Sequence, residues 1–159
     1  MNHEERTQQA YEHARRGEWP SLEALLTEGV SVNAQNQKGD SLLMLAAYHG
    51  RIEVVRGLLA RGADPELRND AGQSPLDGVA FKGDAAAVRA LLEAGAAADA
   101  QGADGKTALM VAAMFDRLEI VEVLLERGAR PDRRDAAGRA AVDYASMMGA
   151  QKTAARLMV

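Results

Sequence analysis

The chain has 159 residues, of which 47% are apolar and 26% are charged, a composition typical of soluble globular proteins. Its formal net charge of −4 gives it no general attraction for nucleic acid or for an anionic membrane surface. It has no cysteine, which excludes a disulfide framework and thiolate chemistry.

The chain begins with a polar segment, MNHEERTQQAYEHARRGEW, that lacks the apolar region of a secretory signal. No later segment approaches the run of about 20 apolar residues that spans a membrane, so we expect a cytoplasmic protein. We expect residues 1–9 to be frayed or to begin a capping helix, and a polar first helix over roughly Thr7 to Arg16. Pro20 then falls in the first turn of a second helix, where its missing N–H does no harm.

A period of 33 residues organises the rest of the chain. The segment GDSLLMLAAYHGRIEVVRGLLARGAD begins at Gly39, and similar segments begin at Gly72 and at Gly105. A shortened copy begins at Gly138, and residues 10–35 contain a degraded one. A fixed period of this length is typical of a stacked solenoid, in which each unit buries its apolar face against the next.

Each unit predicts two short helices. Ser41, Ser74 and Thr107 precede the first helix, where a hydroxyl can accept a hydrogen bond from the unpaired N–H groups of the first turn. Apolar residues three and four positions apart predict its buried face. Glycine at the turn between the helices permits a left-handed backbone, but Asp116 stands there in the fourth unit, and we expect mild strain. The second helices are expected over Ile52–Ala60, Ala85–Ala94 and Leu118–Arg127.

Two glycine ladders and the Leu-Leu pairs keep one register over nearly the whole chain. On these residues, and on the segments GQSPLDGVA, GKTALMVAA and xVVxxLLxxGAD, the sequence closely resembles the ankyrin repeat family. The resemblance implies an all-α, ankyrin-type solenoid of about five stacked helix-turn-helix repeats, joined by finger loops that resemble β-hairpins. It also implies protein–protein binding through the concave face. The histidine usual in the family's TPLH motif is replaced, so its hydrogen bond to the Ser/Thr position is lost or changed, at Met44, Asp77, Met110 and Asp143.

The resemblance makes residues 1–159 a single ankyrin-repeat domain. Its parts are an N-terminal capping repeat at 4–36, repeats at 37–69, 70–102 and 103–135, and a truncated C-terminal capping repeat at 136–159.

The candidate binding residues are those that the repeat does not need for its own core. The two positions before the turn between the helices are rich in aromatic residues and methionine, and in ankyrin-like geometry they face the concave groove. An apolar stripe there predicts a contact surface, unless these side chains fold back over the alanine-rich helices and complete the core. Polar fingertips would set the choice of partner, or would be ordinary solvated loop residues. The predicted partner-binding residues are Tyr48, His49, Phe81, Lys82, Met114, Phe115 and Met147 at the helix ends, and Lys38, Asp40, Asp70, Gln73, Asp104 and Lys106 at the fingertips.

No pattern of residues predicts catalysis or metal binding. The histidines are scattered, no phosphate-binding GxxxxGK[ST] motif occurs, and Asp132 and Asp135, flanked by arginines, are expected in a solvated loop. We therefore expect a non-catalytic module without a cofactor or metal. It would bind an unidentified protein partner as scaffold, inhibitor or stabiliser, and neither nucleic acid nor membrane.

Two other functions stay open. The apolar stripe would also suit a homodimer, although a monomer is the first expectation. An enzyme or metal protein on a repeat scaffold would need a deep pocket with convergent titratable groups, which the sequence does not predict.

Overall fold

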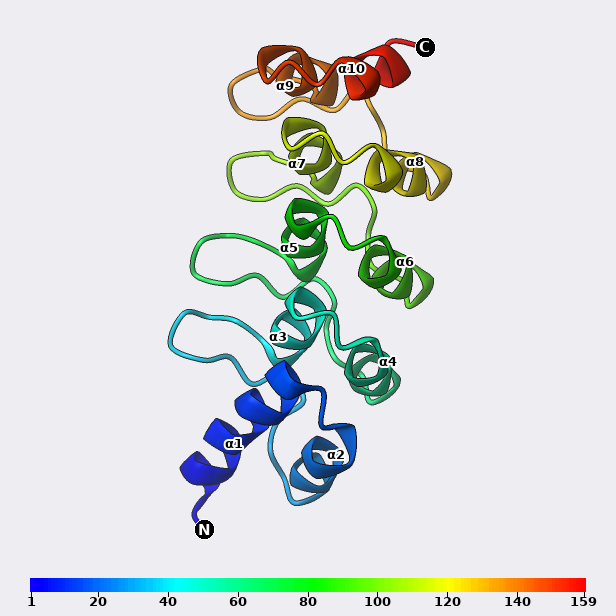
Figure 1. The fold of residues 1–159 in the computed structure, drawn as a ribbon. Helices are drawn as coiled ribbons and strands as arrows, with labels where there is room; N and C mark the ends of the chain where they lie inside the picture. Colours follow the sequence, from blue (N-terminus) through cyan, green and yellow to red (C-terminus); the bar gives the residue numbers. More distant parts are fainter.

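The repeat predicted from the sequence folds into stacked pairs of helices. The computed structural model describes residues 1–159 and contains ten α-helices and no β-strand. Consecutive helices form pairs, which Figure 1 shows stacked along one direction, with loops projecting from one side. The all-α solenoid is therefore confirmed. The helices are α1 (His3–Arg16), α2 (Trp19–Thr27), α3 (Leu42–Tyr48), α4 (Ile52–Ala60), α5 (Pro75–Lys82), α6 (Ala85–Glu93), α7 (Ala108–Met114), α8 (Leu118–Glu126), α9 (Ala141–Met147) and α10 (Gln151–Leu157).

Three inner helices, α3, α5 and α7, start where the hydroxyl residues predict. The side-chain oxygens of Ser41, Ser74 and Thr107 accept hydrogen bonds from backbone N–H groups three residues later, at 3.0, 3.1 and 3.2 Å. Each hydroxyl satisfies a donor that the first helical turn leaves unpaired. Helices α6 and α8 end one residue earlier than expected, at Glu93 and Glu126.

The N-terminal helix begins earlier than expected. Helix α1 starts at His3 and not near Thr7, because the Asn2 side chain caps it by accepting a hydrogen bond from the Glu5 N–H at 2.8 Å. Most of its first turns are exposed, as a terminal helix without an outer neighbour requires. Its buried side chains are Ala10, Tyr11 and Ala14.

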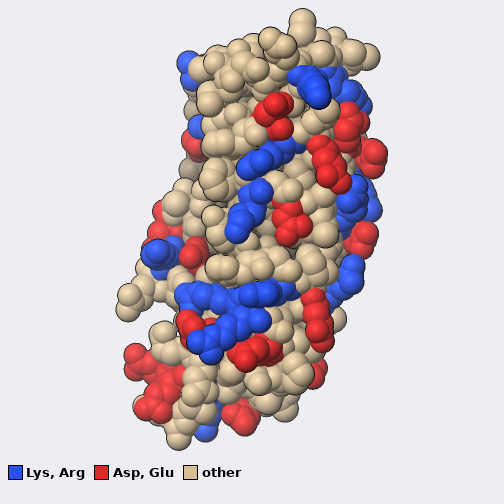
Figure 2. Space-filling view, viewed as in Figure 1, with Lys and Arg blue, Asp and Glu red and all other residues tan.

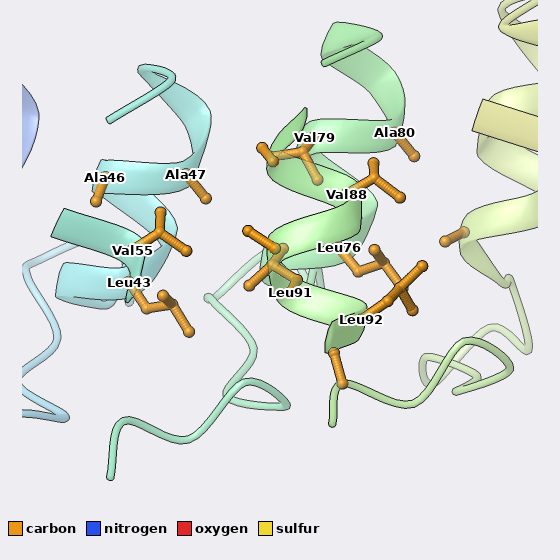
Figure 3. Packing of buried hydrophobic residues seen from close by; sticks show 14 of the residues in the cluster. Leu43, Ala46, Ala47, Val55, Leu76, Val79, Ala80, Val88, Leu91 and Leu92 are labelled. Carbon is orange, nitrogen blue, oxygen red and sulfur yellow. The ribbon is translucent and has the colours of Figure 1, made fainter. Parts of the chain in front are cut away.

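The core is one continuous column that runs through all the helix pairs. Leu58, Leu91 and Leu124 occupy the same position in successive outer helices, and all three are fully buried. Figure 3 shows Ala47 and Val55 of one pair directed toward the next pair. Each pair therefore buries its apolar face against a neighbour, and the small alanines let the helices approach closely.

At three of the junctions between neighbouring units, a cationic side chain of one unit caps the inner helix of the unit before it. Each donates to a backbone carbonyl at or near the helix C-terminus, where positive charge interacts favourably with the helix dipole. These hydrogen bonds help to fix how one unit sits on the next. They run from Arg51 Nε to the Arg15 carbonyl at 2.8 Å, from Lys82 Nζ to the Tyr48 carbonyl at 3.4 Å, and from Arg117 Nε to the Phe81 carbonyl at 3.2 Å.

The loops between the pairs form four fingers, at residues 36–40, 69–73, 102–106 and 135–139, here called fingers 1 to 4. Each is a tight turn closed by two backbone hydrogen bonds between its own residues. The only bridge of β type in the structure joins Gln35 to Ser41 beside finger 1. The fingers therefore resemble hairpins in their turns but carry no strands.

Asp116 adopts the left-handed backbone that the sequence predicts for its position. Its φ of 55° makes it the one residue other than glycine with a positive φ. Its carboxylate also accepts a hydrogen bond from the Thr153 hydroxyl of the last helix at 2.7 Å, and Thr153 is fully buried. The strained residue thus supplies the partner of a buried polar group.

We expect Asp116→Gly to reduce the free energy of unfolding, although glycine prefers this backbone. Relief of the left-handed conformation is worth about 1 kcal/mol, whereas a buried hydroxyl left without its acceptor costs about 1 to 3 kcal/mol. Urea unfolding of the single variant and of the double variant with Thr153→Val measures both contributions, the relief of backbone strain and the cost of the unpaired hydroxyl. The double variant should be at least as stable as the wild type, and a single variant of wild-type stability would contradict the role of Asp116.

No helix of the chain combines the length and the apolar character needed to cross a membrane.

Candidate functional site

Two adjoining hollows lie between the inner helices and the fingers. The large hollow has a volume of about 970 Å³ and lies beside fingers 1 and 2, and the small hollow of about 480 Å³ lies between fingers 2 and 3. Phe81 and Gln73 line both, so the two form one groove. Of the predicted binding residues, all line this groove except Lys82 and Met147.

Three aromatic rings form an apolar stripe along the groove. Tyr48, Phe81 and Phe115 are 38%, 42% and 40% exposed, so they do not belong to the buried core. The rings of Phe81 and Phe115 meet edge to face, with their centroids 4.8 Å apart. Lys82 Nζ lies 4.4 Å from the centre of the Tyr48 ring. Lys82 therefore supports the stripe from outside the groove.

The two predicted methionines differ in their surroundings. Met114 is half-buried, packs against the core and lines the small hollow. Met147 is 59% exposed at the end of α9 and lies outside both hollows. The stripe that lines the groove therefore ends at Phe115.

His49 lies among positive charges at the edge of the large hollow. Burial lowers the pKa of its imidazole below the usual value, and the charges of Lys82, Arg15 and Arg51 lower this pKa further. The ring is consequently neutral at pH 7. Figure 2 shows Lys and Arg gathered in a band that crosses the molecule near α1 and α4, with acidic side chains on either side.

The predicted fingertip residues are held by neighbouring groups to different degrees. Asp104 accepts a hydrogen bond from the Lys106 ammonium at 3.2 Å, and the Lys106 backbone N–H and ammonium hold the pKa of Asp104 below its usual range. Asp40 accepts from the Asn69 side chain at 2.9 Å. Lys38 and Asp70 form no ion pair. Much of the groove rim is thus held in place by hydrogen bonds within the chain itself.

The expectation of a solvated loop at residues 132–135 is correct for Asp132 and wrong for Asp135. Asp132 is exposed and pairs with Arg130 at 3.2 Å. Asp135 is buried, and its carboxylate accepts hydrogen bonds from the Tyr144 hydroxyl and from two backbone N–H groups of finger 4. The missed signal was its repeat position, which asparagine occupies in fingers 1 and 2.

The acidic replacements of the TPLH histidine form hydrogen bonds that sequence reasoning missed. The Asp77 carboxylate accepts from the Ser74 backbone N–H at 3.0 Å and from the Arg68 guanidinium at 3.0 Å. The Asp143 carboxylate accepts from the Ala140 backbone N–H at 2.8 Å. In both helices the acid reaches back to the start of its own helix, so the change in hydrogen bonding takes the form of a capping interaction.

No group of three or more His, Cys, Asp or Glu side chains is placed to hold a metal ion. The groove instead combines exposed aromatic rings with a rim of polar fingertips, which is the general anatomy of a protein interface.

Comparisons with known proteins agree with the repeat architecture. A family model of ankyrin repeats in three copies matches residues 10–101 and 76–159. A curated ankyrin repeat protein of Pseudomonas aeruginosa is 53% identical over 56 residues, which are 35% of this chain and 33% of that protein. The matched segment therefore spans about a third of the length of this relative. The family match extends over the stacked helix pairs and the fingers alike, and the chain belongs to the ankyrin repeat family.

Proposed function

We propose that the chain is a non-catalytic module that binds one protein partner in its concave groove and acts on it as scaffold, inhibitor or stabiliser. Ankyrin repeats are generally protein–protein interaction modules. The observation that carries the proposal is the stripe of Tyr48, Phe81 and Phe115, three residues that are each about 40% exposed. Clustered, partly exposed aromatic side chains are typical anchors of protein interfaces.

The two sets of predicted residues have different roles in this proposal. The aromatic stripe supplies the apolar contact area, and Lys82 and His49 flank it. The fingertip residues Lys38 and Asp70 have no ion pair of their own, so they are available to charges of the partner. The remaining proposed rim residues are Asp40, Gln73, Asp104 and Lys106, while Met147 lies beyond the groove and has the weakest support.

The test is a variant in which Tyr48, Phe81 and Phe115 are all changed to serine. We expect partner binding to weaken by about 1,000-fold or more, because interface anchors contribute about 2 kcal/mol or more each and their contributions are not fully additive. The melting temperature should fall by only about 5 °C, because none of the three residues belongs to the buried core cluster. The measurement is affinity purification from the native cell beside thermal unfolding.

The control changes two exposed methionines outside the groove, Met148 and Met158, to serine. This variant should retain the partner that the triple variant loses. If the triple variant unfolds and no partner is lost selectively, the rings serve the core and the proposal is wrong.

A second copy of the chain is the alternative occupant of the stripe, because the same exposed rings would be buried in a homodimer. Sedimentation at two concentrations separates the two functions. A dimer that persists to low micromolar concentration, and that dissociates in the triple serine variant, would favour self-association over a foreign partner.

A further inference from the structure

The junction between fingers 2 and 3 differs from the junctions between fingers 1 and 2 and between fingers 3 and 4. A backbone hydrogen bond joins finger 1 to finger 2, from the Asp70 N–H to the Lys38 carbonyl at 3.0 Å. Another joins finger 3 to finger 4, from the Ala136 N–H to the Asp104 carbonyl at 2.8 Å. No such bond joins finger 2 to finger 3, and the small hollow of about 480 Å³ lies at this step.

The next step along the chain shows what fits between two fingers. Tyr144 of α9 lies beside finger 4 and is only 6% exposed. Its hydroxyl donates to the Asp135 carboxylate. Lys106 Nζ and Arg139 Cζ lie 5.8 and 6.0 Å from the centre of its ring. An aromatic ring with a hydroxyl thus fills this space, with a cation from each of the two fingers beside it.

The residues one period earlier line the equivalent space, between fingers 2 and 3, but do not fill it. Valine replaces the tyrosine, and glycine replaces the aspartate that holds the hydroxyl, so both the ring and its acceptor are missing. The two positions that are equivalent to the cations beside the Tyr144 ring are still occupied by a polar or cationic residue. The four replacements, all of which line the small hollow, are Val111 for Tyr144, Gly102 for Asp135, Gln73 for Lys106, and Lys106 for Arg139.

The glycine in finger 3 also removes hydrogen bonds that the other fingers keep. At this position Asn36, Asn69 and Asp135 each accept two backbone N–H groups of their own finger through one side-chain oxygen. Gly102 has a φ outside the left-handed region, so its backbone does not require glycine. A Cβ there would meet the Arg68 guanidinium at 3.2 Å. Glycine therefore leaves room beside Arg68, and finger 3 lacks the two side-chain hydrogen bonds that the other fingers have.

Charge in the small hollow favours an uncharged occupant. The Arg68 guanidinium pairs with Asp77 at 3.0 Å, and Lys106 pairs with Asp104 at 3.2 Å, so both cations already have a carboxylate partner. The remaining walls include Phe81 and other apolar side chains. An apolar ring would meet these walls, and a hydroxyl on it would reach the polar rim.

We propose that the small hollow is an anchor pocket for one aromatic side chain of the partner, with tyrosine as the best fit. The partner's ring would take the place that Tyr144 fills one repeat further on. This inference rests on the proposed function, because it assumes that the groove receives a protein segment.

The first test titrates the ¹⁵N-labelled wild-type protein with p-cresol, the side-chain analogue of tyrosine. We expect selective shifts of the amide signals of Gly72, Gly102 and Lys106, with a dissociation constant of about 1 mM, as is usual for so small a ligand. Toluene should bind more weakly at the same amides, and n-butylammonium and acetate should not shift them. Absence of p-cresol shifts, or shifts spread over the whole chain, would overturn the proposal.

The second test copies the filled space into the empty one by Val111→Tyr together with Gly102→Asp. We expect this graft to weaken p-cresol binding by about tenfold or more and to raise the melting temperature, because the new pair occupies the hollow. The control is Ala137→Tyr, which adds the same ring to exposed finger 4 and should leave p-cresol binding unchanged. A folded graft that still binds p-cresol like the wild type would refute the assignment, and the wild-type titration decides alone if the graft does not fold.

The two proposals fail in different ways. If p-cresol binds selectively but the triple serine variant loses no partner selectively, the proposed function is wrong, and the small hollow accepts an aromatic ring without being an anchor pocket for a partner. If a partner is lost selectively but p-cresol does not bind, the groove is correct and the aromatic anchor is wrong.

Discussion

Replacing Gly57 by alanine is expected to lower the free energy of unfolding by about 1 to 3 kcal/mol, the usual cost of overpacking a filled site. Gly57 lies in the middle of α4, and Trp19 of α2 packs directly against it. A Cβ built on Gly57 lies 2.5 Å from Cζ2 and 2.6 Å from Cε2 of the indole ring. The bulky ring cannot yield by a small shift, so either α2 or α4 must move.

Gly78→Ala is the matched control, because Gly78 also lies inside a helix, α5. Its Cβ would meet nothing nearer than the Tyr48 ring at 3.8 Å, which is an ordinary contact. This variant should gain about 0.5 to 1 kcal/mol, because alanine loses less backbone entropy than glycine in a helix. Urea unfolding followed by the fluorescence of Trp19, the single tryptophan, measures both variants. Effects of the same sign at both positions would contradict the packing argument.

Asp135→Ala is expected to cost about 3 kcal/mol, because it removes a buried charged acceptor and leaves the Tyr144 hydroxyl without a partner. The two backbone N–H groups of finger 4 would lose their acceptor as well. Tyr144→Phe is the matched comparison, since it removes only one of these hydrogen bonds and should cost about 1 kcal/mol. A loss in Asp135→Ala no larger than that in Tyr144→Phe would contradict the assignment, because it would show that the backbone N–H groups of finger 4 gain nothing from the carboxylate.

The same carboxylate predicts a dependence of stability on pH. The hydrogen bond from Tyr144, and after it that from the Arg139 backbone N–H, lowers the pKa of Asp135 below its usual value. A carboxyl group with a lowered pKa in the folded state stabilises the protein above its unfolded pKa of about 3.9, and this stabilisation is lost as the pH falls through the folded pKa.

The measurement is urea unfolding between pH 7 and pH 2.5 for the wild type and for Asp135→Asn. Asparagine keeps an acceptor for finger 4, as Asn36 and Asn69 do in their own fingers, but does not titrate. The stability difference between the two proteins should therefore shrink as the pH falls below about 4. A difference that stays constant over the whole range would contradict the assignment to Asp135.

Much of the fold could be read from the chain alone because its determinants are local. Glycine positions, the hydroxyl residues before the inner helices and the Leu-Leu pairs each act within a few residues, and they recur every 33 positions. The same register placed the aromatic stripe at the ends of α3, α5 and α7. The capping of α1 by Asn2 was missed because a terminal unit departs from the repeat.

Other features depend on residues that meet only when the units are stacked. Thr153 reaches Asp116 across 37 positions of sequence. The buried state of Asp135 depends on Tyr144, which covers it from the following helix. The small hollow exists because valine and glycine stand where the next unit has Tyr144 and Asp135. No local pattern reports such contacts, because burial depends on the volume that neighbouring units leave free.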